Sequence, residues 1–190
     1  FNIYFQMATF QVEDRWIELY RRRMCEFDKI FYWRCTSRID ALDLKSIPKL
    51  GQIGMRVLDL GLESASHRQL KLMKKTTNPK DYLQKAEEIL HVAYESGIWV
   101  KLNVFLTAGE TYETLTETMQ WLDKNRKYIK GISANCETIY GPYNHLLESL
   151  KPFGATYVCN SDLEEKGYSY INLSDEINYD LAKTLAKDIS

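Results

Sequence analysis

An acid and a hydroxyl follow directly on an apolar run in residues 54–66, GMRVLDLGLESAS. The run is typical of a buried strand, and Glu63 and Ser64 stand where it passes into the next connection. A carboxylate accepts hydrogen bonds from a sugar diol or an ammonium group, and a hydroxyl both donates and accepts. The two side chains therefore predict contact with a polar small molecule at the end of this strand.

Polar, charged or turn-forming residues also follow the other strand-like runs. These positions are Arg38 and Asp40 after residues 30–35, Gly109 and Glu110 after residues 98–106, and Tyr140 with Gly141 at the end of residues 131–140. Each has an ordinary structural explanation as well, as a local ion pair, a helix cap or an acid near a helix N-terminus. Their recurrence at successive strand ends favours a shared polar rim that binds a ligand.

The elements that must position this rim alternate between strand and helix. Strand-like runs occupy residues 1–5, 30–35, 55–62, 98–106 and 131–140, and amphipathic helical patterns lie between them. Asn78 and Pro79 suit the start of one such helix, and Gly97 suits its end. Five strand–helix units in succession predict an α/β fold of parallel strands, because parallel neighbours need crossover connections. No glycine-rich phosphate loop follows an early strand, so we expect a partial barrel and not an open doubly wound sheet.

The chain divides into two parts by this pattern. Residues 1–154 carry the strand–helix succession and are expected to form the partial barrel. Residues 155–190 form a polar tail, in which Ser174 to Glu176 resemble a helix start and Ile177, Leu181 and Leu185 recur at four-residue steps. We expect one amphipathic helix there.

Composition excludes several functional classes. The 190 residues contain 25 Lys and Arg against 26 Asp and Glu, and the basic residues are scattered, so a nucleic-acid interface is not expected. No run approaches the ~20 apolar residues of a membrane span, and no leader opens the chain. A cytoplasmic protein is the default expectation.

The four cysteines carry no metal or redox motif. Cys25, Cys35, Cys136 and Cys159 are separated by more residues than such motifs use. The sequence therefore predicts no metal ligands within this chain, and favours small buried residues in a reducing compartment.

The order of these segments resembles the later part of a radical S-adenosylmethionine (SAM) enzyme core, and is most similar to the group that often carries an upstream cobalamin-binding domain. The segments that carry the resemblance are WRCTSRID, MRVLDLGLESASHRQLKLMKK, GIWVKLNVFLTAGET and ETIYGPY. The resemblance implies about five of the six strand–helix units of a partial barrel. It also implies SAM and a [4Fe-4S] cluster as cofactors, with cobalamin possible through a further domain upstream.

The resemblance assigns roles to particular residues. The family's glycine-x-acid-Ser motif falls on Gly61, Glu63 and Ser64, and by this resemblance Glu63 and Ser64 would contact the ribose or methionine part of SAM. The basic residue of the following helix falls on Lys75, as a partner for the methionine carboxylate. The remaining implied cofactor-binding residues are Arg38 and Asp40 of the Arg-x-Asp motif, Gly109 and Glu110 of the Gly-Glu-Thr turn, and Phe105, Leu106 and Tyr140 beside the adenine.

The chain also departs from the family pattern. Leu106 and Ala108 replace a glycine and a proline of the turn in LTAGET, and Tyr140 to Tyr143 replace a Pro-Gly-Thr turn. The Cys-x3-Cys-x2-Cys loop that holds the cluster is absent, and without three thiolates the chain cannot carry out radical chemistry alone.

The first residues, FNIYFQMATF, fit the family's second strand, with Met7 and Ala8 in place of an acidic pair. Residues 1–6 also resemble a protease-tag remnant, and a native strand is the favoured interpretation. A parallel sheet that begins with this strand would expose unpaired backbone groups at its edge, so we expect a dimer or a missing N-terminal segment there.

Three functions remain open at this level. The first is an enzyme core, an oxidoreductase or transferase, that binds SAM for radical-based methylation, cyclisation or rearrangement of a small-molecule or peptide substrate. The second is a degenerate barrel that serves as a scaffold or partner-binding subunit. The third is an unrelated barrel enzyme with Glu63 and Glu110 as an acid–base pair.

Overall fold

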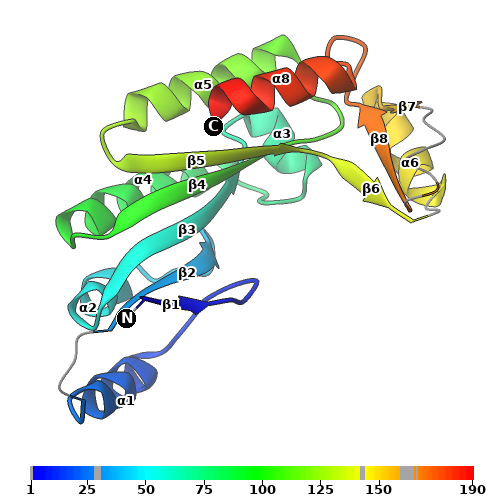
Figure 1. The fold of residues 1–190 in the computed structure, drawn as a ribbon. Helices are drawn as coiled ribbons and strands as arrows, with labels where there is room; N and C mark the ends of the chain where they lie inside the picture. Colours follow the sequence, from blue (N-terminus) through cyan, green and yellow to red (C-terminus); the bar gives the residue numbers. More distant parts are fainter. Residues whose placement is uncertain (1, 28–30, 142–143, 159–164, 166) are drawn as a thin grey trace. The chain divides into compact units, whose positions relative to one another are not determined.

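The computed structural model describes residues 2–27, 31–141, 144–158, 165 and 167–190. Strands and helices alternate along the first part of the chain, and three short strands follow (Figure 1). The elements are β1 (Asn2–Phe5), α1 (Asp14–Met24), β2 (Tyr32–Arg38), α2 (Ser46–Gln52), β3 (Met55–Glu63), α3 (His67–Leu72), α4 (Pro79–Glu95), β4 (Trp99–Leu106), α5 (Tyr112–Asn125), β5 (Ile129–Cys136), β6 (Thr138–Tyr140), α6 (Asn144–Leu150), a 3₁₀ turn (Lys151–Phe153), β7 (Thr156–Val158), β8 (Tyr168–Asn172) and α8 (Tyr179–Ile189).

One sheet contains β1 to β5 in sequence order, with all five strands parallel. The predicted α/β class of parallel strands with intervening helices is therefore confirmed. The predicted first strand is present as β1, which pairs with β2 from Asn2 opposite Tyr32 to Phe5 opposite Cys35. Phe1 lies outside the described residues. No helix in the described part of the chain is long and apolar enough to span a membrane.

A second sheet was not expected from the sequence. It has the order β6-β8-β7 with antiparallel pairing on both sides of β8. The run at 131–140, expected as one strand, is divided between β5 in the first sheet and β6 in the second. The tail therefore contains β7 and β8 in addition to its helix.

Two helix boundaries also differ from the sequence prediction. The tail helix α8 begins at Tyr179, because Asn178 is its N-cap and the Asn178 side chain accepts a hydrogen bond from the Leu181 amide. Ser174 does not cap a helix; its Oγ accepts from the amides of Glu176 and Ile177 in a turn. The sequence pattern also places a short helix around residues 43–50, whereas α2 covers Ser46–Gln52.

The described chain forms two compact units. The first unit contains Phe1–Leu62, Lys80–Asn103 and Lys124–Ile132, and the second contains Glu63–Pro79, Val104–Asp123 and Ser133–Ser190. We describe each unit by itself.

The core of the first unit combines a helix stripe with one face of the strands. On α4, Ala86, Ile89, Leu90 and Ala93 follow three- and four-residue steps and have no exposed surface. Leu58 and Leu60 of β3 and Val100 and Leu102 of β4 are buried in the same unit. Each large aliphatic side chain of this kind stabilises the fold by about 1.5–3 kcal/mol.

An aromatic cluster packs α1 against β1 and β2 in the first unit. Its members are Phe5, Phe10, Trp16, Tyr20 and Trp33. Phe5 lies 5.3 Å from Trp33 in an edge-to-face arrangement, and Trp16 stacks on Tyr20 at 5.1 Å. Because such pairs add to the energy of burial, the cluster fixes the first helix to the edge of the sheet.

Candidate functional site

The three N-terminal strands carry a polar face in the first unit. Along β2, Trp33, Cys35 and Ser37 are buried, whereas Arg34 and Arg38 between and after them are exposed. A parallel strand that is covered on both faces has a nearly continuous apolar sequence. The alternation in β2 therefore indicates that one of its faces has no apolar covering. We call it the polar face; its residues are Tyr4, Arg34, Thr36, Arg38 and Asp59.

The polar face is held together by direct contacts. Arg34 donates to Asp59 Oδ2 from Nε at 3.1 Å and from Nη2 at 2.5 Å, and this hydrogen bond raises the pKa of Arg34. Arg34 also lies over the Tyr4 ring at 4.8 Å, and the Tyr4 hydroxyl is 3.1 Å from that of Thr36. Asp59 is almost fully buried, so its charge is balanced by Arg34 inside the sheet.

Sequence reasoning missed Arg34, Asp59, Tyr4 and Thr36 as candidate residues, because it looked only at the strand ends. The signal was present in YWRCTSR, where a polar or charged side chain stands at every second position. It was also present in MRVLDLGL, where one acid interrupts an apolar strand. Period-two alternation in a strand of a parallel sheet is the pattern that would have identified this face.

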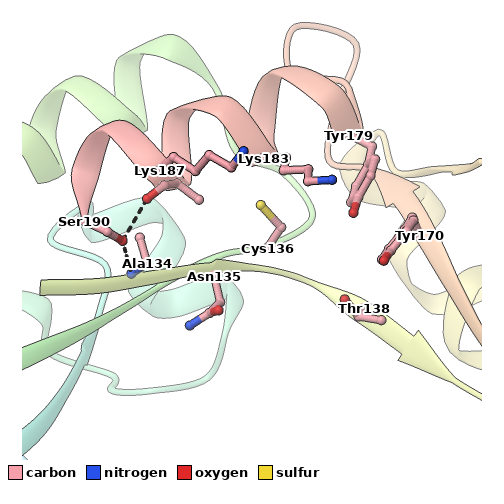
Figure 2. A pocket seen from close by; sticks show the side chains of 10 residues that line it. Ala134, Asn135, Cys136, Thr138, Tyr170, Tyr179, Lys183, Lys187 and Ser190 are labelled. Atoms are coloured by element: carbon pink, nitrogen blue, oxygen red, sulfur yellow. Dashed lines mark hydrogen bonds between the residues drawn. The ribbon is translucent and has the colours of Figure 1, made fainter.

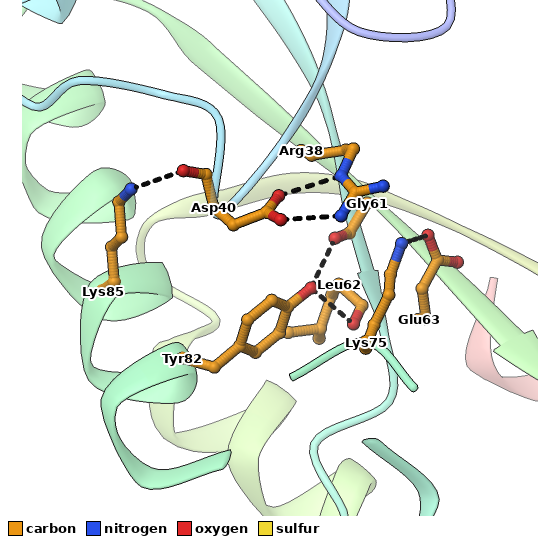
Figure 3. Close-up of polar contacts among 8 residues, drawn as sticks. All are labelled: Arg38, Asp40, Gly61, Leu62, Glu63, Lys75, Tyr82 and Lys85. Carbon is orange, nitrogen blue, oxygen red and sulfur yellow. Dashed lines mark hydrogen bonds and ion pairs between the residues drawn. The ribbon is translucent and has the colours of Figure 1, made fainter. Parts of the chain in front are cut away.

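Arg38 of the polar face forms an ion pair with Asp40 at the carboxyl end of β2. Arg38 donates from Nε to Oδ1 at 2.9 Å and from Nη2 to Oδ2 at 2.6 Å, the two-pronged geometry favoured by a guanidinium and a carboxylate (Figure 3). Lys85 of α4 donates to the Asp40 carbonyl at 3.1 Å. Both side chains of the pair are about half exposed, so a ligand can reach them.

Tyr82 secures the end of β3 within the same unit. Its buried hydroxyl donates to the carbonyl of Gly61 at 3.0 Å and lies 3.3 Å from that of Leu62 (Figure 3). The hydroxyl thereby satisfies backbone acceptors where the strand ends, immediately before Glu63 in the chain.

In the second unit, Glu63 pairs with Lys75. Lys75 Nζ lies 3.0 Å from Glu63 Oε1, and both side chains are largely buried, with exposures of 20% and 24% for the lysine and the glutamate (Figure 3). Lys75 was expected within a helix, but α3 ends at Leu72 and Lys75 lies three residues beyond that end. The structure thus brings together two of the residues that the sequence singled out.

The backbone around this pair is strained. Glu63 and Lys74 are the two non-glycine residues with positive φ in the described chain, at 67° and 54°. Lys74 is the left-handed residue of a Schellman motif, in which the Lys75 amide donates to the Leu70 carbonyl and the Lys74 amide to the Lys71 carbonyl. The motif ends α3 and directs Lys75 toward Glu63. Strain of this kind is concentrated at binding sites.

Ser64 lies inside the second unit. Its hydroxyl is 3.1 Å from that of Thr118 and accepts from the Ser66 amide at 3.1 Å. Thr118 Oγ1 also accepts from the Ala65 amide. These contacts fix the turn after Glu63, so the role of Ser64 in the structure is to hold the backbone that presents the acid.

The loop after β4 contains Gly109 and Glu110. Gly109 has a φ of 83°, and a Cβ there would come within 2.8 Å of Leu72 Cδ1, so the position needs glycine. Glu137, which sequence reasoning also missed, accepts from the Thr107 hydroxyl and from the Ala108 amide at 3.0 Å. The loop is therefore rigidly held.

Glu110 is only 1% exposed. Burial raises its pKa to about 7, while hydrogen bonds, one of them from Thr114 Oγ1 at 2.6 Å, limit the rise. Its backbone carbonyl accepts from Ser174. A carboxylate in this setting holds a proton near neutral pH and is poised for proton transfer only if a ligand reaches it.

The two aromatic candidates differ in their surroundings. Phe105 lies on β4 and is partly exposed, between the buried Val104 and Leu106. Tyr140 ends β6 in the second sheet, is 69% exposed, and has the Tyr168 ring 6.4 Å away. Pro142 and Tyr143 of the following turn lie outside the described residues.

The described side chains do not assemble a metal centre. No group of three His, Cys, Asp or Glu residues lies close enough for one, within the residues described above. The expectation that the cysteines are buried is wrong for Cys25, which is exposed, whereas burial of Cys35 raises the pKa of its thiol to about 12. Because an iron–sulfur cluster needs three thiolates together, these thiols do not fit one. Cys159 is outside the described residues.

No family model matches the chain, and no curated protein matches it in sequence. Solved structures do share its fold. The radical SAM methyltransferase TsrM from Kitasatospora setae, solved with tryptophan and a SAM analogue, matches 77% of this chain with a TM-score of 0.60 and 14% identity. The cobalamin-dependent SAM radical enzyme OxsB matches 64% with a TM-score of 0.52 and 18% identity, and the radical SAM enzyme HemN from Escherichia coli, a coproporphyrinogen III oxidase, matches 72% with a TM-score of 0.50 and 14% identity.

These neighbours establish the fold of the chain. Its parallel sheet and helices resemble those of radical SAM enzymes, in agreement with the resemblance found in the sequence. The chain spans 30% of the TsrM chain, 19% of OxsB and 29% of HemN.

Proposed function

We propose that this chain is the SAM-binding part of a radical SAM enzyme core that modifies an unactivated carbon of an organic substrate. The observation that carries the proposal is the Glu63–Lys75 ion pair, which a strained backbone holds at the carboxyl end of β3. The fold it shares with TsrM, OxsB and HemN supports the same proposal.

The pair has the chemistry to bind an amino acid. A carboxylate and an ammonium 3.0 Å apart can each exchange their partner for the opposite charge of a zwitterion. Glu63 would then accept from the α-ammonium or the ribose hydroxyls of SAM, and Lys75 would donate to the methionine carboxylate. Ser64 would keep the turn in place through Thr118.

The proposal assigns the other candidate residues within each unit by itself. In the first unit, Arg38 and Asp40 offer an exposed pair of the same kind. In the second unit, Phe105 and Tyr140 offer aromatic surface for adenine. Gly109 and Glu110 shape the loop after β4. Arg34, which is exposed on the polar face of the first unit, offers a guanidinium group to a polar substrate, either a small molecule or a peptide.

SAM supplies a radical only when a reduced cluster cleaves it, and the described thiols do not fit that cluster. The cluster, and the cobalamin that TsrM and OxsB bind, therefore belong to the proposal only through protein outside the described residues. The part assigned to this chain is to bind and orient SAM.

Calorimetric titration of the 190-residue chain with S-adenosylhomocysteine tests the proposal. We expect a measurable heat, and binding weakened about tenfold or more in Glu63→Gln and in Lys75→Gln, since each loses a charge-assisted contact. Glu117→Gln, on the exposed side of α5, is the matched control and should bind as the parent does. Binding that is equal in all four proteins would disprove the assignment of this pair.

The second candidate function is a degenerate barrel that acts as a scaffold or partner-binding subunit. The inert, buried Cys35 and the absence of a cluster-binding set among the described thiols favour it. This candidate predicts no heat with S-adenosylhomocysteine in any of the four proteins.

A further inference from the structure

A pocket of about 390 Å³ opens in the second unit between the end of β5, strand β8 and helix α8 (Figure 2). Its lining residues are Ala134, Asn135, Cys136, Thr138, Tyr170, Tyr179, Lys183, Ala186, Lys187 and Ser190. None of the residues assigned to SAM lines it. The pocket is therefore separate from the site proposed above.

The charged side chains of this pocket are both positive. Lys183 and Lys187 stand four residues apart on α8, so they share one face of the helix, and no acid lines the pocket. In the part of the chain described here, neither lysine forms an ion pair. Two like charges at this spacing repel each other, and an anion between them would remove that cost.

The far end of the pocket is aromatic. Tyr170 and Tyr179 stack with ring centroids 4.0 Å apart and an interplanar angle of 13°, and Lys183 Nζ lies 6.0 Å from the Tyr179 centroid (Figure 2). Burial raises the pKa of Tyr179, and its hydrogen bond with Tyr170 adds to the rise, so this hydroxyl stays neutral. The pocket thus combines cationic groups with a flat, uncharged aromatic surface.

The helix that carries the lysines is fixed in position. The Ser190 hydroxyl donates to the Ala186 carbonyl at 2.9 Å and accepts from the Ala134 amide of β5 at 2.9 Å (Figure 2). Ala182, Ala186 and Ile189 are buried beneath the helix. One face of α8 thus packs on the core. The two lysines lie outside that face and have no structural role in the core.

We propose that this pocket binds a small organic anion. A carboxylate or phosphate would lie between Lys183 and Lys187, and a ring or other apolar part would pack on Tyr170 and Tyr179. Cys136, whose Sγ points from β5 toward α8, would be covered by the bound molecule (Figure 2). The site is distinct from the SAM site and does not depend on it.

Alkylation of Cys136 by iodoacetamide, located by peptide mass spectrometry, reports occupancy directly. The probe is phenyl phosphate, with sodium chloride added to equal ionic strength in all samples. At a concentration about three times Kd, alkylation of Cys136 should become about fourfold slower, because the rate of modification scales with the unoccupied fraction. Cys25, which is exposed, should react at an unchanged rate in the same sample.

Variants and simpler probes separate the two parts of the site. Lys183→Gln and Lys187→Gln should each raise the phenyl phosphate concentration that halves the alkylation rate of Cys136 by about tenfold, with each rate compared with that of the same variant without the probe, and the Arg variants should retain the parent's value. Lys71→Gln, an exposed lysine of α3, is the matched control. Inorganic phosphate should protect less than phenyl phosphate, and phenol should not protect.

Three results would overturn the proposal: no protection by phenyl phosphate, protection that survives both Gln substitutions, or equal protection by phenol. The titration of S-adenosylhomocysteine should be the same in Lys183→Gln as in the parent. Failure of the SAM proposal and failure of this one are therefore told apart by separate measurements.

Discussion

At the scale of single residues, Glu110 makes a specific prediction about pH. Its pKa in the folded protein is about 7 against 4.5 for an ordinary glutamate, so the folded state holds the proton more tightly. The free energy of unfolding is therefore greatest below about pH 4.5 for this group and falls as the pH rises to 7. The 2.5-unit difference corresponds to a loss of about 3 kcal/mol above pH 7.

Glu110→Gln should remove this loss of stability above pH 7. The amide oxygen can still accept from Thr114, and the side chain never ionises. Urea unfolding at pH 5 and pH 8 should show the variant to be up to about 3 kcal/mol more stable than the parent at pH 8 and much closer to it at pH 5. Glu113→Gln, at an exposed position of α5, should leave the pH dependence unchanged. If the free energy of unfolding of Glu110→Gln changed with pH as that of the parent does, the assignment of the raised pKa to Glu110 would be contradicted.

Only part of this residue-level picture can be predicted from sequence. Glu63 was found because an acid after an apolar run is a local signal. The burial of Glu110 depends on contacts with residues far along the chain, such as the bond from Ser174 that spans 64 positions. Lys75 was found through the family resemblance, but its placement by a Schellman turn depends on the exact end of α3, where sequence patterns are least informative.

At the scale of elements, the end of α3 contains backbone strain that a substitution can remove. Lys74 adopts a left-handed conformation that costs a non-glycine residue about 1–2 kcal/mol, whereas glycine adopts it freely. Lys74→Gly should stabilise the protein by about 0.5–1 kcal/mol, since the larger freedom of the unfolded glycine cancels part of the gain.

Thermal unfolding measures this change as a rise in Tm of about 2–4 °C per kcal/mol for a chain of this size. Lys71→Gly, within α3 itself, is the matched control and should destabilise by about 1 kcal/mol, because glycine is a poor helix former there. A fall in Tm for Lys74→Gly would show that the turn does not need a left-handed residue at this position.

Elements differed in how well the sequence predicted them. Helix α4 and strand β4 were predicted closely because their apolar periodicity extends over many residues. Strands β6, β7 and β8 have three to five residues each and carry no alternation that separates them from a loop. Their pairing becomes favourable only when the three strands are brought together.

At the scale of the whole chain, the order of the large sheet followed from the strand–helix alternation, because consecutive parallel strands with helical crossovers lie next to each other. The polar face of β1–β2–β3 could not be found by that rule, which concerns topology and says nothing of which face is covered. The polar face was identified from the exposure of Arg34 and Arg38 on β2, a strand whose other face is buried. The fold thus follows from the alternation of strands and helices along the chain, whereas the polar face follows from the alternation of residues within one strand.

The position of β1 at one end of that sheet leads to a last prediction, about association. β1 pairs with β2 on one side, and an unpaired strand edge is a template for a further strand. We propose that two copies of this chain pair through β1. Multi-angle light scattering of the 190-residue chain should show a mass that rises from monomer to dimer with concentration, and the amides of Ile3 to Phe5 should become protected from hydrogen exchange over the same range. A constant monomer mass together with concentration-independent exchange at β1 would show that this edge does not pair with a second copy.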